Sequence, residues 1–468
     1  MNGSSLKLLL VQCPAWGVEL PPINLALLKA AVIESGFECE AWDLNVQSYQ
    51  QSPVDDRQYW DKHSLTTWVN LESFNTKILP NIQNFLLAKA DQIFLSHVHV
   101  VGMTIVDTTV HASNLLAKFL KQRNSKICII AGGPAMSFKE CRVRLSQDFD
   151  YYLVGEGEEA IVEFLRTFEH RITNKNSSKM PLPDGFYSTN DELHRDLPLR
   201  QLSTLASQPK PDFTDFELHP YTESALPMIS TRSCLFQCKF CADIHSMGSF
   251  RKLSTEQIFR DLCQVHKLGY RKVWMNDLLI NGILKELIEA FDKFNAEGCY
   301  VQWIALATPN NQLKTDVLES LFKSGLHTLN FGLETGSPKI MRLMGKGFNL
   351  KQAEAALKRT RDAGIETQLN VIVGFPGETE DDFKMTIDFL ERNQKYISGF
   401  TSVNSCIVLP GSELSRKKDN YCIEFPENMD PSQWFIGESN TPGIRKKRLD
   451  TLLDWIKSSK YSVYCSNS

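Results

Sequence analysis

The run Cys234-Leu-Phe-Gln-Cys238-Lys-Phe240-Cys241 places three thiols on one tight loop. It follows residues 227–231, an apolar segment that is expected to form a strand. A structural zinc site takes four protein ligands, so three cysteines do not complete one. A cubane four-iron cluster held by three thiolates keeps one iron free to bind another molecule. The run therefore favours a reactive iron–sulfur centre, with three buried or zinc-binding cysteines as the plain alternative.

The pattern C-x-x-x-C-x-aromatic-C resembles the signature of the radical S-adenosylmethionine (radical SAM) superfamily. In that family the three cysteines, here Cys234, Cys238 and Cys241, hold a 4Fe-4S cluster. Its open iron binds the amino and carboxylate groups of S-adenosyl-L-methionine (SAM), and an electron from the cluster cleaves SAM to a 5′-deoxyadenosyl radical. The resemblance implies the cluster and SAM as cofactors, and an electron donor such as flavodoxin or ferredoxin as a partner.

Size and composition are those of an ordinary globular protein. With 468 residues the chain is expected to form two or three domains with buried cores. It is 42% hydrophobic and 23% charged, and no apolar stretch approaches the length of a membrane span. The net charge of −4 argues against a nucleic-acid partner, which would require neutralised phosphates. The twelve cysteines form no disulfide framework, and the amino-terminal apolar run does not fit a signal peptide, so a cytoplasmic protein is expected.

The first third of the chain alternates strand-like and helix-like segments. Strands are expected at 8–13, 39–44, 93–105, 126–131 and 151–154, and helices at 23–35 and 112–122. Such alternation predicts a parallel, doubly wound α/β sheet. Two strands end in glycine-containing turns, Gly132-Gly133-Pro134 and Gly155-Glu156-Gly157. Ligands of these sheets bind at the carboxyl ends of strands, so the turns predict a cofactor cleft, although each alone also fits a simple tight turn.

These strand ends, in this order before the cysteine run, resemble the cobalamin-binding Rossmann-like domain of cobalamin-dependent radical SAM enzymes. The resemblance covers residues 1–165 and implies cobalamin as a third cofactor. Other cobalamin proteins ligate cobalt through an Asp-x-His-x-x-Gly loop, whereas the loop at 13–17 contains no histidine. The cobalt is therefore expected to lack a protein imidazole ligand, and His97, His99 and His111 are expected to be structural. The cobalamin contacts assigned in this way are Trp16, Thr104, Asp107, Thr108, Gly132, Gly133, Pro134, Gly155, Glu156 and Gly157.

The rest of the chain is expected to contain a linker, a barrel and a small terminal region. Residues 166–226 contain several prolines and a polar run, which predicts a linker. Residues 227–409 repeat strand then helix six times, which predicts a partial (β/α)6 TIM-type barrel with its active site at the carboxyl ends of the strands. Residues 410–468 are expected to close the barrel and to contribute substrate contacts.

Polar residues follow three of the barrel strands, at 276–277, 334–337 and 374–378, where each alone also fits a cap or turn. By resemblance to the family, the SAM contacts are assigned to Phe240, Asn276, Asp277, Glu334, Ser337, Ile372 and Gly374. Two segments depart from the family pattern. The usual Arg-Gly-Cys-Pro is Arg232-Ser-Cys-Leu235, and the usual Asp-Asp is Asn276-Asp277, but the three cysteines are intact.

Taken together, the resemblances imply a cobalamin-dependent radical SAM enzyme. Among those, a C-methyltransferase is expected, which transfers a methyl group from methylcobalamin to an unactivated carbon of a small-molecule or natural-product substrate. An oxidative cyclase or ring-rearranging enzyme with the same cofactors is the alternative. A zinc-binding sensor without catalysis is a third interpretation. Because the cofactors carry the reaction, no catalytic acid or base is assigned.

Overall fold

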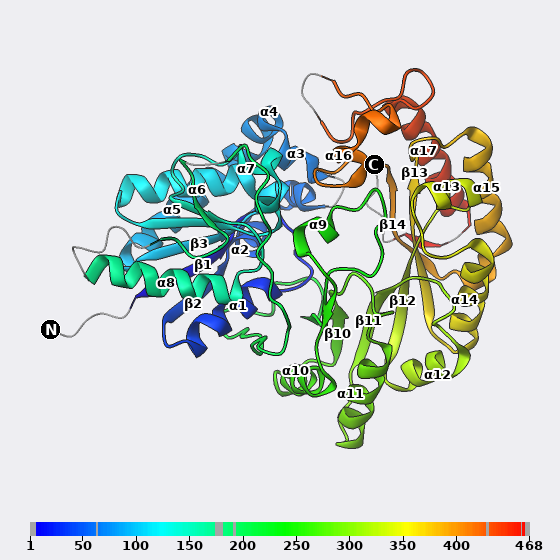
Figure 1. Cartoon of the computed structure of the whole chain (residues 1–468), viewed down its shortest axis with the longest axis horizontal. Helices are drawn as coiled ribbons and strands as arrows, with labels where there is room; N and C mark the ends of the chain where they lie inside the picture. Colours follow the sequence, from blue (N-terminus) through cyan, green and yellow to red (C-terminus); the bar gives the residue numbers. More distant parts are fainter. Residues whose placement is uncertain are drawn as a thin grey trace. The chain divides into compact units, whose positions relative to one another are not determined.

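The computed structural model describes residues 6–61, 64–173, 181–190, 193–426, 430–459 and 461–463. The chain divides into two compact units, Met1–Ser224 and Ala225–Ser468, and Figure 1 labels most of their helices and several of their strands. Each unit contains its own extended sheet, with six strands in the first and seven in the second.

Unit 1 is a doubly wound sheet with the strand order β2-β1-β3-β4-β5-β6. The strands are β1 (Lys7–Gln12), β2 (Glu38–Asp43), β3 (Val100–Thr104), β4 (Cys128–Gly132), β5 (Tyr151–Leu153) and β6 (Phe186–Ser188). The helices are α1 (Ile23–Glu34), α2 (Leu44–Gln51), α3 (Thr66–Val69), α4 (Leu71–Ser73), α5 (Leu79–Leu95), α6 (Val110–Arg123), α7 (Lys139–Arg142) and α8 (Glu158–Thr173). All strand pairs are parallel except β5 with β6. Helix α1 packs with α8, and α5 packs with α6 (Figure 1). This architecture confirms the predicted parallel α/β sheet.

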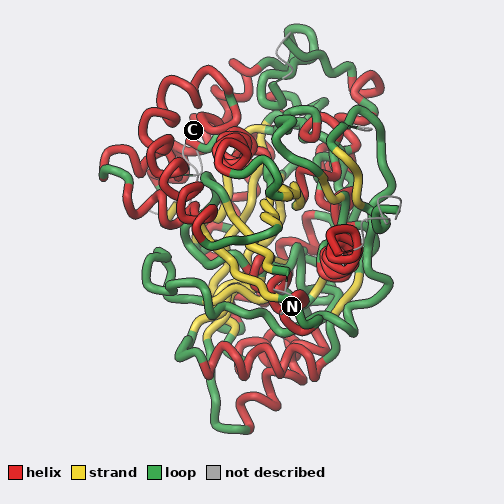
Figure 2. Tube along the Cα trace, turned by 90° about the vertical axis from the view of Figure 1, so that its left-hand side faces the viewer, coloured by secondary structure: helices red, strands yellow, loops and turns green. Residues whose placement is uncertain are grey.

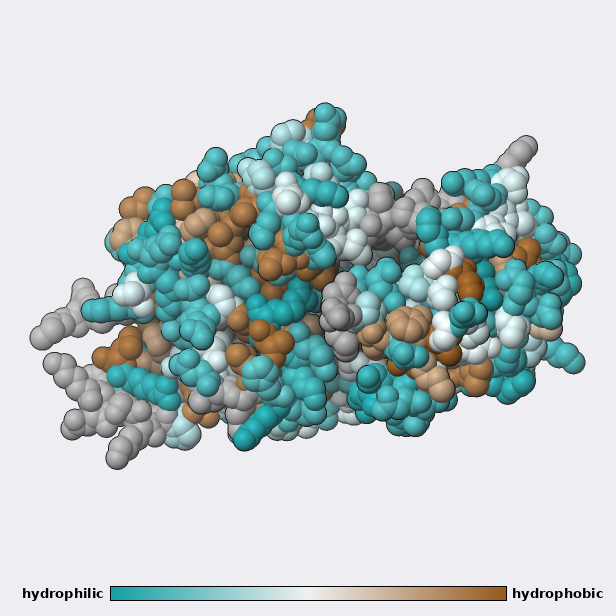
Figure 3. Space-filling model, turned by 90° about the horizontal axis from the view of Figure 1, so that it is seen from above, coloured by the Kyte–Doolittle hydropathy of each residue, from teal (hydrophilic) through white to brown (hydrophobic). Residues whose placement is uncertain are grey.

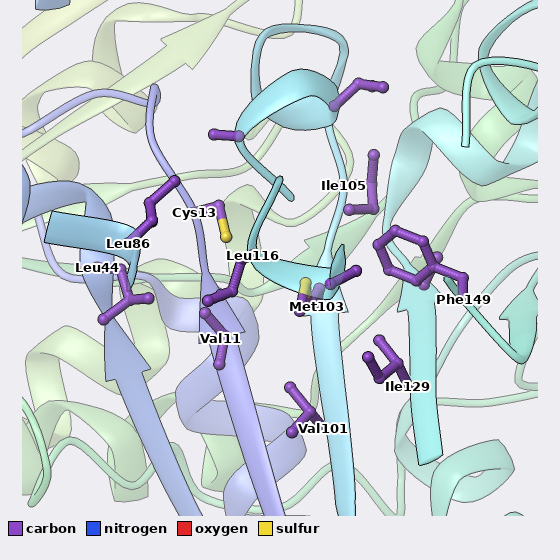
Figure 4. Packing of buried hydrophobic residues seen from close by; sticks show 14 of the residues in the cluster. Val11, Cys13, Leu44, Leu86, Val101, Met103, Ile105, Leu116, Ile129 and Phe149 are labelled. Carbon is purple, nitrogen blue, oxygen red and sulfur yellow. The ribbon is translucent and has the colours of Figure 1, made fainter. Parts of the chain in front are cut away.

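Strands β1, β3 and β4 of unit 1 are buried on both faces, as expected for a sheet covered by helices on each side. Val11 of β1, Val101 of β3 and Ile129 of β4 belong to one buried cluster. Leu86 of α5 and Leu116 of α6 pack into the same cluster (Figure 4). Burial of both faces explains why these strands read as continuous hydrophobic runs.

The third strand is shorter than the sequence pattern predicted. Helix α5 continues through Leu95, and β3 begins only at Val100. Ile93 completes the buried stripe of α5, so its apolar character belongs to a helical period. His97 and His99 therefore lie in the turn before β3, where the Lys7 amide donates to His99 Nδ1 at 3.2 Å.

The structure places much of the predicted linker, 166–226, inside unit 1. Helix α8 extends to Thr173, and β6 pairs antiparallel with β5. Asp215 accepts a hydrogen bond from the Ala41 amide at 2.8 Å, and the Tyr221 hydroxyl donates to the Asp43 carboxylate at 2.7 Å. Both contacts attach the segment to β2. Its polar, proline-rich composition indicates irregular backbone, but these side chains make it part of the unit, which ends at Ser224.

Unit 2 contains a sheet with the order β15-β14-β13-β12-β11-β10-β7, in which all neighbours are parallel. The strands are β7 (Leu226–Met228), β10 (Lys272–Met275), β11 (Gln302–Ala307), β12 (Leu326–Glu334), β13 (Glu366–Val373), β14 (Gly399–Ser405) and β15 (Ser462–Val463). A small ribbon pairs β8 (Thr231–Arg232) with β9 (Arg251–Lys252). The helices are α9 (Asp243–Met247), α10 (Thr255–Lys267), α11 (Leu284–Ala296), α12 (Thr315–Lys323), α13 (Pro338–Leu343), α14 (Leu350–Asp362), α15 (Glu380–Arg392), α16 (Glu413–Arg416) and α17 (Pro442–Ser458). Figure 2 shows the strands in yellow and the helices in red. The six strands β7, β10, β11, β12, β13 and β14 confirm the predicted partial barrel.

None of the helices in the described part of the chain is both long and apolar enough to cross a membrane. On the face drawn in Figure 3, hydrophobic and hydrophilic residues are interspersed. Trp16 is one of the exposed large hydrophobic residues of unit 1, with 49% of its surface accessible.

The contact between Tyr221 and Asp43 provides a test of the revised boundary of unit 1. Tyr221→Phe removes a hydrogen bond to a buried carboxylate, so it should lower the free energy of unfolding by about 1–3 kcal/mol. Urea denaturation measures this change, and Tyr300→Phe at an exposed site of unit 2 is the control. A loss no larger than that of the control would mean that the segment does not stabilise the unit.

Candidate functional site

Asp277 fixes the segment that leads from the end of β7 into the cysteine loop. The Asp277 carboxylate follows the neighbouring strand β10 and accepts hydrogen bonds from the Ser230 amide at 3.0 Å, the Ser230 hydroxyl at 3.0 Å and the Thr231 hydroxyl at 2.5 Å. Ser233 then takes a positive φ of 69°, and its hydroxyl donates to the Gly248 carbonyl at 2.6 Å. Because β7 and β10 are parallel neighbours, these bonds hold the loop at the carboxyl end of the barrel.

The three thiols lie on one turn of this loop and are all partly exposed. The Cys241 amide donates to the Cys238 carbonyl at 3.1 Å, and the Phe236 amide donates to the Cys234 sulfur at 3.4 Å. An N–H bond to sulfur favours the thiolate, which is the form that binds iron. No three His, Cys, Asp or Glu side chains in the described ranges are grouped closely enough to hold a single metal ion. A four-iron cluster is wider than one ion, so the donor set of this turn fits such a cluster.

A buried ammonium group lies beside the thiols. The Lys346 side chain is 9% exposed and pairs with Glu334 at 3.2 Å, and its Nζ also donates to the Gly332 carbonyl at 3.0 Å. The same atom lies 5.4 Å from the ring centre of Phe240, the aromatic residue of the cysteine loop. Burial alone lowers the pKa of Lys346, but the charges of Glu334 and Cys238 outweigh it and raise that pKa. The lysine is therefore protonated and opposes the loss of thiolate that burial causes at Cys238.

Glu334 and Ser337, both assigned to SAM from the sequence, have different surroundings. Glu334 ends β12 with a positive φ of 67°, and burial raises its pKa against the opposing effect of Lys346. Ser337 is fully buried, donates to the Asp382 carboxylate at 2.7 Å and accepts from the Ile340 amide at 3.3 Å. Ser337 thus caps α13, whereas Glu334 keeps a carboxylate at the rim of the barrel.

The two residues of the pair Asn276-Asp277 also differ in their surroundings. Asp277 is 2% exposed, and burial raises its pKa to about 6. Its oxygens are occupied by the β7 end, which makes it a positioning residue for the cysteine loop. Asn276 is exposed, and its backbone amide donates to the Met228 carbonyl at 2.7 Å. Its side chain is therefore the member of the pair that can reach a ligand.

Phe240 and Ile372 are brought together by the fold. Both pack against one apolar cluster that contains Trp434 from the C-terminal region. Both residues are assigned to SAM, and a shared apolar surface suits contact with its adenine ring. The Trp434 indole donates to the Cys406 carbonyl at 2.8 Å, so this tryptophan belongs to the core.

Gly374 has a backbone role that explains the glycine. Its φ is 78°, which side chains rarely tolerate. Its amide donates to the Glu378 carboxylate at 2.6 Å, and its carbonyl accepts from Asn440 at 3.0 Å. Burial raises the pKa of Glu378 to about 7, while Arg448 pairs with it at 3.0 Å. Gly374 is therefore bound by its own turn and by the C-terminal region.

Lys346 and the Glu378–Arg448 pair were missed by the sequence analysis. A lysine between two glycines, Gly345-Lys346-Gly347, was the available signal for the first. The Glu378–Arg448 pair joins the turn after β13 to an arginine on α17, and no local sequence pattern connects these two segments.

The carboxyl edge of the unit 1 sheet gathers most of the predicted cobalamin residues. Thr104 and Gly132 end neighbouring strands in register. The Thr108 hydroxyl donates to the Ala15 carbonyl at 2.6 Å, which ties the turn after β3 to the loop that carries Trp16. These segments form one continuous rim, the place where doubly wound sheets bind their ligands.

Several side chains on this rim form hydrogen bonds or ion pairs within the protein. The Thr104 hydroxyl accepts from Asn24 Nδ2 at 3.1 Å, and Asp107 forms an ion pair with Arg144. Pro134 begins a short helical turn, Pro134–Ser137. His111 bonds to the Val69 carbonyl at 3.0 Å, consistent with a structural role.

The two adjacent glycines after β4 have different functions. Gly133 has a φ of +94°, and a Cβ there would lie 2.8 Å from the carbonyl oxygen of Ile105. Local packing alone therefore requires glycine at this position. A Cβ at Gly132 would meet no atom within 4 Å. Gly132 is thus the residue with open space beside it, which fits a bound cofactor.

The second glycine turn is covered by the chain itself. Gly155 has a φ of +111°, and a Cβ there would lie 2.0 Å from the Arg200 carbonyl oxygen. The Glu156 amide donates to that carbonyl at 2.9 Å, and the Glu156 carboxylate accepts from the Leu202 amide at 2.5 Å. The Gly157 Cβ position lies against Leu28. These contacts give the second turn a structural function.

Comparison with known proteins finds a relative by sequence and, separately, solved structures with a similar fold. The uncharacterized methyltransferase PH0819 of Pyrococcus horikoshii is 25% identical over 67% of this chain and 68% of its own length. Among solved structures, the radical SAM methyltransferase TsrM of Kitasatospora setae, with cobalamin and a 4Fe-4S cluster bound, superposes with a TM-score of 0.68 at 14% identity, over 95% of this chain and 85% of TsrM. The cobalamin-dependent radical SAM enzyme OxsB, with aqua-cobalamin and SAM bound, gives 0.69 at 16% identity, over 97% of this chain and 67% of OxsB. At such identities the two structures establish the fold.

The opposite charges of Lys346 and Glu334 predict opposite effects on a cluster bound by the cysteine loop. Lys346→Met removes a nearby buried positive charge, so the reduced cluster should become harder to form. We expect its midpoint potential to fall by roughly 60 mV, a tenfold change for a one-electron couple. Glu334→Gln should raise the potential, and Lys346→Arg should preserve it. A redox titration followed by electron paramagnetic resonance measures all three, and equal shifts of the same sign would contradict the assignment.

The open space beside Gly132 predicts that a side chain there blocks cobalamin without disturbing the fold. Gly132→Val should lower the retained corrinoid by about tenfold or more, with Gly132→Ala intermediate and both melting temperatures close to that of the wild type. Gly133→Ala should instead destabilise unit 1, because it introduces a Cβ at a positive φ. Absorbance of the bound corrinoid and thermal unfolding separate these effects. Full corrinoid retention by Gly132→Val would exclude this rim as the binding place.

A family model described as the radical SAM superfamily matches residues 228–390. This range begins in β7, contains the three-cysteine loop and continues through β13 into α15. The match therefore coincides with the site built from Cys234, Cys238, Cys241, Lys346 and Glu334. Residues 228–390 thus match the radical SAM superfamily, and the chain shares the fold of TsrM and OxsB.

Proposed function

We propose that this chain is a cobalamin-dependent radical SAM enzyme that transfers a methyl group to an unactivated carbon of a small molecule. The observation that carries the proposal is that one chain has two strand-end edges suited to binding cofactors. One is the cysteine loop at the carboxyl end of the partial barrel, and the other is the carboxyl edge of the unit 1 sheet with open space at Gly132. The methyltransferase name of the Pyrococcus relative supports methyl transfer as the outcome.

When bound, the cluster and SAM supply a radical that removes a hydrogen atom from the substrate, and cobalamin supplies the methyl group. The chain binds and orients these groups. Cys234, Cys238 and Cys241 would hold the cluster, and Lys346 offsets their negative charge. Asp277 holds the loop through its bonds to the β7 end.

The remaining assignments concern SAM and cobalamin. Phe240 and Ile372 offer an apolar surface for adenine, and Glu334 and Asn276 offer polar groups at the rim. In unit 1, Trp16, Asp107 and Pro134 are exposed, and Gly132 has open space beside its backbone.

The electron donor and the compartment belong to the same proposal. The cysteine loop is the one cysteine-rich run in the sequence, so the electron would come from a separate protein such as flavodoxin or ferredoxin. The cysteines in the described part of the chain are all free thiols, as expected in the reducing cytoplasm.

The product distinguishes methylation from the alternative, oxidative cyclisation or rearrangement with the same cofactors. The reconstituted holoenzyme would be incubated without oxygen with SAM, a reductant and the metabolite that accumulates when its gene is deleted. We expect a product heavier by one CH2 unit, together with S-adenosylhomocysteine and 5′-deoxyadenosine, by mass spectrometry. Cys238→Ala should abolish both SAM products, and Cys422→Ala at an exposed site should abolish neither.

Two results would contradict the proposal in different ways. A product without added carbon, formed with 5′-deoxyadenosine, would favour cyclisation or rearrangement. Wild-type iron content and SAM cleavage in Cys238→Ala would remove the cluster assignment itself.

A further inference from the structure

The interior face of the partial barrel can be identified from β12. The residues of β12 that point away from the interior are fully buried: Leu329, Phe331 and Leu333. A Cβ on Gly332 would lie 2.9 Å from the Glu334 carboxylate oxygen and 3.4 Å from the Lys346 ammonium. Gly332 therefore faces the candidate site. Asn330, two residues earlier on the strand, shares that face.

Neighbouring strands continue this face in register. Asn330 pairs with Gln368, and Gly332 pairs with Asn370. Asn370 in turn pairs with Ser402 of β14. Paired residues of parallel strands project to the same side, so the interior carries a row of polar side chains. The interiors of such barrels are usually packed with bulky branched apolar residues, so this row requires an explanation.

Two amides of the row have unsatisfied oxygen atoms. The Gln368 Oε1 atom accepts a hydrogen bond from the Thr401 hydroxyl at 2.9 Å. In contrast, the Oδ1 atoms of Asn330 and Asn370 are shielded from solvent and accept no hydrogen bond within the described part of the chain. Asn330 as a whole is 2% exposed. A shielded acceptor without a donor costs free energy, which a ligand that donates to it would offset.

The part of the interior formed by β10 and β11, next to β12, is apolar. Trp274 of β10 and Ile304 and Leu306 of β11 are partly exposed, while the residues that alternate with them are buried. Leu306 is in register with Asn330, so apolar and amide surfaces adjoin. The interior positions in the middle of β10–β14 carry no charged side chain.

We propose that this interior binds an uncharged substrate group that carries N–H or O–H donors on one side and an apolar edge on the other. Asn330 and Asn370 are its specificity-determining residues and accept hydrogen bonds from those donors. The apolar edge lies against β10 and β11. This inference rests on the proposed function in that it places the substrate in the radical SAM barrel.

Unliganded stability gives the first test, because it needs no substrate. If Asn330 serves a ligand, then Asn330→Leu removes a buried unsatisfied oxygen and should leave the melting temperature of the reconstituted protein unchanged or raise it. A marked fall in melting temperature would assign Asn330 a structural role and overturn its part of the proposal. Asn295→Leu is the matched control, since its Oδ1 is also unpartnered but lies on α11, outside the interior.

Binding of matched fragments gives the second test. Ligand-observed NMR on the reconstituted full chain would compare indole with 1-methylindole, and benzamide with N,N-dimethylbenzamide, benzoate and benzylamine. We expect the N–H compounds to bind about fivefold more tightly than their methylated partners, the factor of one net hydrogen bond. Asn330→Leu and Asn370→Leu should lose this preference, and Asn295→Leu should retain it. SAM affinity should be equal in all four proteins.

The outcomes separate this inference from the proposed function. Preference for benzoate or benzylamine, no preference for N–H compounds, or an unchanged preference in both interior variants would overturn it. A parallel loss of SAM affinity would assign the amides to SAM and overturn it as well. SAM cleavage by the wild type would stand in each of these cases. Conversely, absent SAM cleavage with the expected preference would reject the proposed function and leave the interior as an uncharged-ligand site.

Discussion

The buried ammonium of Lys346 is the group on which the site in unit 2 depends. Three thiolates and the Glu334 carboxylate would concentrate negative charge in a partly buried place, where uncompensated charge is costly. Lys346 compensates part of it and is held at 3.0 Å by the Gly332 carbonyl and at 3.2 Å by Glu334. Its position beside Phe240 links it to the cysteine loop. Strand β12, the turn after α13 and the cysteine loop thus act as one electrostatic unit, which Asp277 orients from β10.

Local patterns were sufficient to predict the architecture and the cysteine loop. Thiol spacing and the alternation of strand and helix are short-range properties, so they can be recognised without tertiary structure. Lys346 is far from the cysteines in sequence, and only the turn after α13 brings it near them. Ser337 shows the opposite case. Its position after β12 fitted a ligand residue, but its hydroxyl accepts from the Ile340 amide to cap α13 and donates to Asp382 of α15.

In unit 1, the backbone conformation and the tertiary contacts of a glycine motif could not be predicted from its sequence. Gly132 and Gly133 are identical in sequence, and they differ only in φ and in the direction of the missing Cβ. Gly155 likewise looked like a ligand glycine until the Arg200 backbone was placed against it. The same contact explains the revised unit boundary, because the segment that covers Gly155 is part of the predicted linker. Polar composition indicated a loop correctly, but it carried no information about which residues that loop would bond.

Strand β12 divides stability and recognition between its two faces. Leu329, Phe331 and Leu333 are buried on the outer side and anchor the strand. The alternate residues, Asn330 and Gly332, lead along the inner side to the Glu334 carboxylate. Because side chains alternate with a period of two, the outer packing that fixes the register also fixes which residues face inward. A shift of one residue would turn the amides toward the outer face and the leucines toward the interior. The hydrophobic face therefore determines the chemistry of the interior without contacting a ligand.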